Sequence, residues 1–448
     1  MFNRYTIKRG LIRYIVPACV TFMIAVPQVS AQVYDFDTYV EAVKQYNKDL
    51  KVAAEDRELA SIQQKEAISE ALPTVGFESG YTRNLTDYYM YFDMSALDPE
   101  ASGTVKAPIK RDNELSSTVA LQQTLYSPVV GSAIKASRQY AKLTDYTYKA
   151  AEQSVLTGAK KVFYQCLFLQ EVTRVTKEAE INARENFDNM NLKYEQGQVS
   201  EFELLQAETR WRSTIPEVQQ AERNQKLAMN TLKNLAGVDI AREISLTGTL
   251  DHTMYVPSKT TLDSVFEKRP DFQALSWENE LRKTSLEAPK NAYKPKVTGT
   301  LAYAYSSQSN KMELDEENNL WFVGVNLSVP IYTGGYLKSQ VQKASVELRK
   351  TGLKIEKNKE TIATGIVNAQ LRIEEARLRI ESARSTVETA KKAFSIAEVT
   401  TRNGLSTQLQ LKDARFAFDQ ATINYYAAIY DYLAAYFDWE YAIGQAGE

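Results

Sequence analysis

The sequence predicts a mainly α-helical protein with a few β-strands of the membrane type and an internal tandem duplication. Three observations lead to this fold class. One long stretch without proline carries a heptad pattern, and four short stretches alternate between apolar and polar residues. Similar segments also recur in the same order in the two halves of the chain, which indicates a duplication of a large unit.

The first 31 residues have the layout of a secretory signal peptide. A basic region precedes an apolar run over residues 14–26, and Val29-Ser30-Ala31 fits a small-residue cleavage site. Cys19 lies inside the apolar run and not directly after it, so no lipid anchor is expected. The run is also short for a transmembrane helix. The sequence therefore predicts residues 1–31 to be a signal peptide and the exported chain to begin at Gln32.

Charge, cysteine and histidine content argue against several classes of protein. The chain has 54 basic and 56 acidic residues, and loss of four basic residues with the leader leaves a net charge of −6, which argues against a nucleic-acid partner. Cys166 would be the one remaining cysteine, so no internal disulfide is expected, and we interpret it as a buried apolar residue. The one histidine, His252, lies in a polar connection. We therefore expect no metal, no cofactor and no enzyme active site.

The chain repeats its segments in order. A helical segment over residues 36–71 leads to Pro73, and a second over residues 262–293 leads to Pro295. Each of these prolines precedes a stretch with strand-like alternation. The sequence therefore predicts two structural repeats, residues 32–250 and residues 251–448.

Two stretches in each repeat alternate with a period of two residues. The clearest places Trp321, Val323 and Val325 opposite Gly324 and Asn326. Stretches of about ten residues with an aromatic residue near one end are typical of transmembrane strands. A small half-buried sheet beside a helical body is the alternative. Strands are expected at about residues 73–84, 115–126, 296–307 and 320–331.

The loop over residues 85–114 contains an aromatic run from Tyr88 to Phe92. This run is either part of an aromatic girdle at a membrane interface or a packed loop.

The most regular stretch runs from Tyr336 to Arg402 without a proline. Large apolar residues recur every seven positions, and an alanine follows each of them after three places. This pattern predicts a long coiled-coil helix of roughly 100 Å, and its first-repeat counterpart is expected over about residues 132–194. The pattern consists of Ile366, Ile373, Ile380, Val387 and Phe394, followed by Ala369, Ala376, Ala383, Ala390 and Ala397.

Four strands cannot close a membrane barrel, because every unpaired backbone group in hydrocarbon costs several kcal/mol. Copies of the chain must therefore share one barrel. Two copies would supply eight strands with little bore, and three would supply twelve strands around an aqueous lumen. Amphipathic helices with alanine seams can pack into a second, helical barrel, so a conduit is the expected assembly.

Several motifs resemble the outer-membrane efflux proteins, the TolC-like family. They are the Pro-Xaa-Val strand starts, the segment from Trp321 to Pro330 followed by Ile331-Tyr332-Thr333-Gly334-Gly335, and the repeated glycine-to-serine turn before a leucine-rich helix. The resemblance implies a homotrimer with a twelve-stranded outer-membrane β-barrel and a periplasmic α-barrel. It also implies docking onto a periplasmic adaptor and an inner-membrane pump of the RND or ABC type, for export of drugs or proteins.

The glycine turns are the candidate site. Gly197 and Gly404 can adopt the left-handed conformation that ends a helix, and Ser200 and Ser406 can cap the helix that follows. These four residues are expected to form the periplasmic tip, where an adaptor would bind.

The resemblance also implies a periplasmic entrance narrowed by acidic residues just past the second turn. The matching positions are Gln410 and Asp413, of which only Asp413 is acidic, so a double ring of carboxylates is not expected here. Glu195, Glu201 and Glu203 in the first turn are further candidates. A periplasmic coiled-coil adaptor or scaffold without a membrane barrel is the alternative function.

Overall fold

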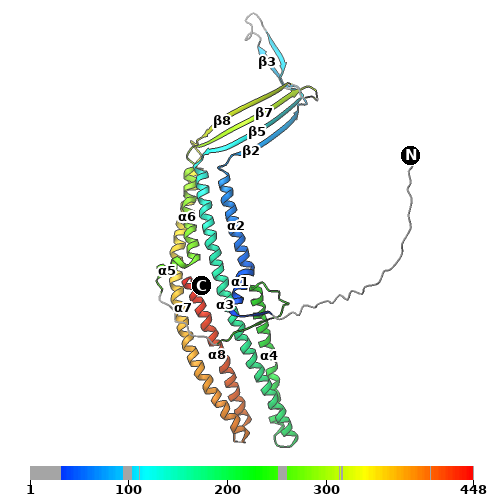
Figure 1. Ribbon diagram of the computed structural model, residues 1–448, viewed down its shortest axis with the longest axis vertical. Helices are drawn as coiled ribbons and strands as arrows, with labels where there is room; N and C mark the ends of the chain where they lie inside the picture. The colour runs from blue at the N-terminus through cyan, green and yellow to red at the C-terminus, as the bar shows by residue number, and fades with distance from the viewer. Residues whose placement is uncertain are drawn as a thin grey trace, which may run out of the picture.

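The computed structural model describes residues 32–93, 103–109, 111–250, 260–311, 313, 316–403 and 405–446. The predicted signal peptide, His252 and Gly404 lie outside these residues. A four-stranded sheet lies at one end of the molecule, and long helices extend from it to two helical turns at the opposite end (Figure 1). The chain is mainly helical with few strands, as predicted.

The two halves of the chain have a similar order of long elements. The first half begins with the short elements β1 (Gln32–Tyr34) and α1 (Phe36–Tyr46) and ends with β6 (Ile244–Leu246), and the second half begins with α5 (Leu262–Lys268). The first half continues with α2 (Lys48–Ser69), β2 (Thr74–Arg83), β3 (Tyr89–Asp93), β4 (Thr104–Pro108), β5 (Asn113–Tyr126), α3 (Pro128–Glu195) and α4 (Glu201–Leu235). The second half continues with α6 (Pro270–Asn291), β7 (Lys296–Ser309), β8 (Glu317–Ser328), α7 (Tyr336–Arg402) and α8 (Gln408–Ile443).

The main sheet is antiparallel with the order β2-β5-β7-β8, so β2 and β8 are its edges. These strands overlap the four stretches in which strands were expected, although β8 begins three residues earlier and ends three residues earlier than the expected 320–331. The register places Phe77, Val119, Tyr303 and Trp321 side by side on one face. The opposite face carries mostly small or polar residues. The predicted alternation thus produces one apolar face and one polar face.

The aromatic run Tyr88–Phe92 is neither a part of the main sheet nor an irregular loop. Most of it forms β3, which pairs with β4 in a separate two-stranded sheet beyond the outer end of β2 and β5 (Figure 1). Met90 and Phe92 lie opposite Ala107 and Val105. The side chains of Met90, Phe92 and Val105 are exposed, so the hairpin projects an apolar face away from the main sheet.

The long helices α3 and α7 each begin shortly after a strand, at residues that favour the start of a helix. Ser127 accepts a hydrogen bond from the backbone N–H of Val130, and Pro128 occupies the first helical position, where its missing N–H costs nothing. At the start of α7, Gly334 and Gly335 have φ angles of 61° and 82°, which glycine adopts without strain. These turns redirect the chain from the sheet into helices of 68 and 67 residues, each about 100 Å long.

The heptad pattern of α7 forms a packed seam against α8. Ala369, Ile373, Ala376 and Ile380 are all buried, which confirms this part of the pattern. Towards the far end of α7, Val387, Ala390 and Phe394 are half-buried. The seam therefore continues towards the turn with less cover from other helices.

The main core lies halfway along the helices, where α1, α3 and the end of α8 meet. The ring of Phe163 contacts the rings of Phe36, Tyr39 and Tyr164, each at a centroid distance of 5.6 Å. Cys166 is fully buried beside them, as predicted, and burial raises the pKa of its thiol to about 12. No helix among the described residues is both long enough and apolar enough to span a membrane.

Candidate functional site

The first helical turn joins α3 to α4 and is closed by backbone hydrogen bonds. Gly197 has φ of 70°, and its N–H donates to the carbonyl of Tyr194 at 2.9 Å. The N–H of Gln198 donates to the carbonyl of Lys193 at 2.9 Å, so the last carbonyl groups of α3 are satisfied. Gly197 thus lies in the left-handed conformation that the sequence predicted.

Ser200 caps α4 through a reciprocal pair with Glu203. The hydroxyl of Ser200 accepts from the N–H of Glu203 at 3.3 Å, and the N–H of Ser200 donates to the Glu203 carboxylate at 2.9 Å. This arrangement is a capping box, which satisfies two backbone donors at a helix start. The hydrogen bonds from the backbone and side chain of Ser200 lower the pKa of Glu203.

The second turn, between α7 and α8, is capped by Thr407 and not by Ser406, which corrects the sequence interpretation. The hydroxyl of Thr407 accepts from the N–H of Gln410 at 3.3 Å, and the N–H of Thr407 donates to the Gln410 side-chain oxygen at 3.0 Å. Ser406 instead donates to the same oxygen at 2.8 Å. The reason is that α8 begins one residue later than Ser406 would require, at Gln408. Gly404 itself lies outside the described residues.

The two capping boxes therefore differ in charge at the same place. Glu203 and Gln410 both occupy the third helical position, but only Glu203 can carry a negative charge. The Gln410 side chain, a candidate for the entrance constriction, is engaged in capping its own helix. Asp413 lies one turn farther along α8, is exposed, and forms no ion pair within the described part of the chain.

The other acidic candidates at the first turn have different surroundings. Glu195 accepts a hydrogen bond from the Asn191 side chain at 3.0 Å, and Glu201 is exposed at the start of α4. The structure thus brings Glu195, Glu201 and Glu203 to one turn, and Gln410 and Asp413 to the other.

Each helical hairpin is held by an aromatic stack above its turn. Phe187 of α3 stacks on Trp211 of α4, with ring centroids 5.4 Å apart and planes 14° apart. Phe394 of α7 stacks on Phe418 of α8, with centroids 6.0 Å apart and planes 2° apart. Offset stacking of this kind adds to the area that the rings bury. The stacks hold the two helices of each hairpin together close to the turn.

Acid should loosen the first capping box and not the second. The folded pKa of Glu203 is lowered, so its contribution is present above the unfolded pKa and is lost as the pH falls through the folded pKa. We expect the amide hydrogen of Ser200, which donates to the Glu203 carboxylate, to exchange faster relative to the intrinsic rate as the pH falls below the ordinary pKa of a glutamate. The amide of Thr407 should show no such change, because its acceptor, the Gln410 side-chain oxygen, does not titrate.

Hydrogen exchange of the full chain at several pH values would check this difference. The Glu203→Gln variant is the matched variant, since it makes the first box chemically like the second. If the protection of both turns falls in parallel with pH, or if Glu203→Gln keeps the pH dependence, the assignment to Glu203 is wrong.

The sheet edges and two helix faces have no partner within the part of the chain that the structure describes. The outer edges of β2 and β8 pair with no other described strand. Apolar stripes at heptad spacing are also exposed on α2 and α7. They consist of Val52, Leu59 and Ile62 on α2, and of Val346, Leu353, Val367, Leu371 and Leu378 on α7.

The described residues contain no group of three or more His, Cys, Asp or Glu side chains that could hold a metal ion. The described residues of the two turns are mostly exposed.

The chain belongs to the outer membrane efflux protein family, whose profile matches residues 39–238 and 261–445. It is 21% identical to the outer membrane protein TolC of Vibrio cholerae over 421 residues, which cover 92% of this chain and 91% of the relative. It is 20% identical to the alkaline protease secretion protein AprF of Pseudomonas aeruginosa over 257 residues, 55% of this chain and 53% of the relative. In fold it is similar to the CmeC outer membrane channel of Campylobacter jejuni, with a TM-score of 0.76 and 19% identity over 92% of this chain and 85% of that one.

The family confirms the function expected from the motifs. The chain is an outer-membrane efflux channel, and its long helices form the periplasmic part. The alternative of an adaptor or scaffold without a membrane barrel is not favoured. Sequence reasoning missed Thr407, although the signal was present: Thr407 and Gln410 have the same spacing as Ser200 and Glu203.

Proposed function

We propose that three copies of the chain form one continuous duct, with a shared twelve-stranded β-barrel in the outer membrane and an α-barrel in the periplasm. The observation that carries this proposal is that the outer edges of β2 and β8 pair with no other strand among the described residues. Unpaired backbone groups cost several kcal/mol each in hydrocarbon, so β8 of one copy must pair with β2 of the next. Three copies supply twelve strands and leave room for a lumen.

The exposed apolar stripes support the same assembly. Heptad-spaced apolar residues on a helix surface require a partner helix. A homotrimer would pack the α7 stripe, which includes Leu353 and Leu371, against the α2 stripe of the neighbouring copy. Residues 32–250 and 251–448 would then act as two repeats, so that six similar units surround the duct.

The assembly is tested by purifying the full chain from outer membranes in mild detergent. Native mass spectrometry should give three times the mass of the processed chain, and the same preparation should conduct ions in planar lipid bilayers. A folded monomer that never enters lipid would contradict the proposal.

We propose further that the two turns dock a periplasmic adaptor, which links the duct to an inner-membrane pump of the RND or ABC type. The duct would conduct its cargo passively, without catalysis, cofactor or nucleic acid. The turns lie at the end of the molecule farthest from the sheet (Figure 1), and Leu405 is 80% exposed there. Phe202 and Leu409 are also exposed at this end, and a group of uncovered large apolar residues favours a protein contact.

A photo-crosslinking amino acid at position 405 tests the docking surface in intact cells. It should capture a periplasmic protein, which mass spectrometry identifies. The matched control is position 227 on α4, where Leu227 is also exposed but lies far from the turns. Equal capture at both positions, or none at 405, would exclude this turn as the docking surface.

We also propose that Asp413, with Gln410 beside it, narrows the periplasmic entrance. A ring of carboxylates attracts cations at a constriction, so Asp413→Ala should lower the cation-to-anion permeability ratio about twofold or more in planar bilayers. The control is Glu217→Ala, which removes an exposed carboxylate from a different helix, α4. Unchanged conductance and ion selectivity in Asp413→Ala would show that Asp413 does not narrow the entrance.

A further inference from the structure

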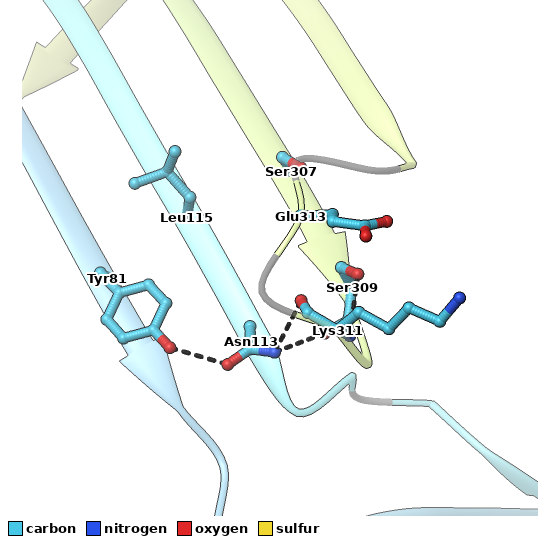
Figure 2. A pocket seen from close by; sticks show the side chains of 7 residues that line it. All are labelled: Tyr81, Asn113, Leu115, Ser307, Ser309, Lys311 and Glu313. Carbon is cyan, nitrogen blue, oxygen red and sulfur yellow. Dashed lines mark hydrogen bonds between the residues drawn. The ribbon is translucent and has the colours of Figure 1, made fainter.

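A small pocket lies at the outer end of the sheet, far from the helical turns. Its volume is about 170 Å³. Figure 2 shows its floor on β5 and β7, with the ring of Tyr81 on one side and the chain that follows β7 on the other. The lining residues are Tyr81, Asn113, Leu115, Ser307, Ser309, Lys311 and Glu313.

The pocket opens on the apolar face of the sheet. The register pairs Tyr81 with Leu115, Leu115 with Ser307, and Asn113 with Ser309, so these residues share a face. The same face carries Trp321 and Val323 nearer the helices. In the proposed barrel this face meets lipid, because the opposite face is polar and lines the lumen.

The position along the strand places the pocket at the depth of the lipid headgroups. Val297 begins the apolar face on β7, and Ser307 lies ten residues farther along the strand. Ten residues span about 33 Å along a strand, or about 25 Å along the membrane normal at a tilt near 40°. The apolar band of such barrels is about 25 Å tall, so Ser307 lies at its outer border.

Hydrogen bonds fix the pocket in place. Asn113 is only 8% exposed; its side-chain oxygen accepts from the Tyr81 hydroxyl at 2.7 Å, and its amide donates to the carbonyls of Ser309 and Lys311 at 3.1 and 3.0 Å. The N–H of Lys311 donates to the Ser309 hydroxyl at 3.0 Å. Asn113 thus holds the chain after β7 against β5, and the pocket is formed before any ligand arrives.

One cation and one anion on the rim have no ion-pair partner among the described residues. The side chains of Lys311 and Glu313 are exposed, and neither forms an ion pair with any described residue. Their neighbours behave differently, since the guanidinium of Arg111 donates to both carboxylate oxygens of Glu316. The rim therefore presents opposite charges two residues apart, beside the apolar surface of Leu115 and Tyr81.

We propose that this pocket binds the headgroup of a zwitterionic phospholipid that carries a phosphate and a primary ammonium group. Lys311 would bind the phosphate, Glu313 would accept hydrogen bonds from the ammonium group, and the acyl chains would lie along Leu115 and the apolar face below. A lipid with only a phosphate would leave Glu313 unpaired, and a quaternary ammonium could not donate to it. This inference rests on the proposed placement of the sheet in the membrane.

The test uses the full chain in detergent, titrated with phosphatidylethanolamine, phosphatidylcholine or phosphatidylglycerol of identical acyl chains. Native mass spectrometry measures the lipid retained. Phosphatidylethanolamine should be retained best, and Lys311→Gln or Glu313→Gln should each weaken its binding about three- to tenfold. Glu313→Gln should also abolish the preference for phosphatidylethanolamine over phosphatidylcholine. Lys391→Gln and Glu381→Gln, which alter exposed charges in the lower half of α7, are the matched controls.

The outcomes separate this inference from the proposed function. Equal retention of phosphatidylglycerol, with no effect of Glu313→Gln, would mean a simple anion site and would overturn the proposal. Equal retention of all three lipids would overturn it as well. In both cases a preparation that still conducts ions in bilayers leaves the duct intact, whereas a chain that never enters lipid refutes both.

Discussion

Replacement of Val323 by arginine is expected to prevent stable insertion of the chain into the outer membrane. Val323 is 80% exposed in the single chain, near the middle of β8 on the apolar face. In a soluble protein such a substitution would change the free energy of unfolding by less than about 0.5 kcal/mol. On the lipid face of a barrel, an arginine near the bilayer midplane costs about 2 to 4 kcal/mol. Three copies would each bear this cost in the proposed trimer.

The measurement is the amount of heat-stable trimer recovered from urea-washed outer membranes. Asn326→Arg is the matched control, because Asn326 lies on the same strand but on the polar face, where the proposed lumen would solvate the charge. We expect Val323→Arg to be strongly depleted and Asn326→Arg to be recovered nearly as well as the unmodified chain. Equal recovery of the two variants would mean that the apolar face does not meet lipid.

Replacement of Phe163 by alanine is expected to lower the free energy of unfolding by about 3 to 5 kcal/mol. The ring is 1% exposed and contacts the rings of Phe36, Tyr39 and Tyr164. Its removal leaves a cavity at the place where α1 packs on α3, and it also removes edge and stacking contacts between rings. A loss of this size is large against the stability of most folded domains.

Thermal unfolding followed by circular dichroism would measure this effect as a lower midpoint temperature. The control is Ile181→Ala on the same helix, since Ile181 is 52% exposed and its removal creates no cavity. A midpoint for Phe163→Ala equal to that of the control would show that the aromatic group does not hold α1 to α3.

The sequence predicted those parts of the fold that follow from periodicity. The heptads of α7 became the buried seam around Ile373 and Ala376, and the alternation near Trp321 became a strand with one apolar face. Both patterns depend on local geometry alone, because a helix repeats every 3.6 residues and a strand every two. Cys166, which we interpreted from the sequence as a buried apolar residue, is indeed buried.

Details that depend on one residue of register were harder to predict. Ser406 and Thr407 are adjacent and both can cap a helix, so the choice depended on where α8 begins and on which side chain Gln410 could reach back to. The β3–β4 hairpin was missed because its strands are short and separated by a polar segment. The pocket beside Asn113 joins residues from three strands and the chain after β7, which no pattern along the sequence brings together.

The unequal capping residues have a consequence for whatever binds below the duct. In the proposed trimer, six turns surround the axis, and a carboxylate from Glu203 alternates with a neutral amide from Gln410. The ring of six turns therefore has nearly six-fold symmetry in shape but only three-fold symmetry in charge. A ring of six identical binding partners would meet two chemically distinct surfaces in alternation, and acidification would make the two more alike.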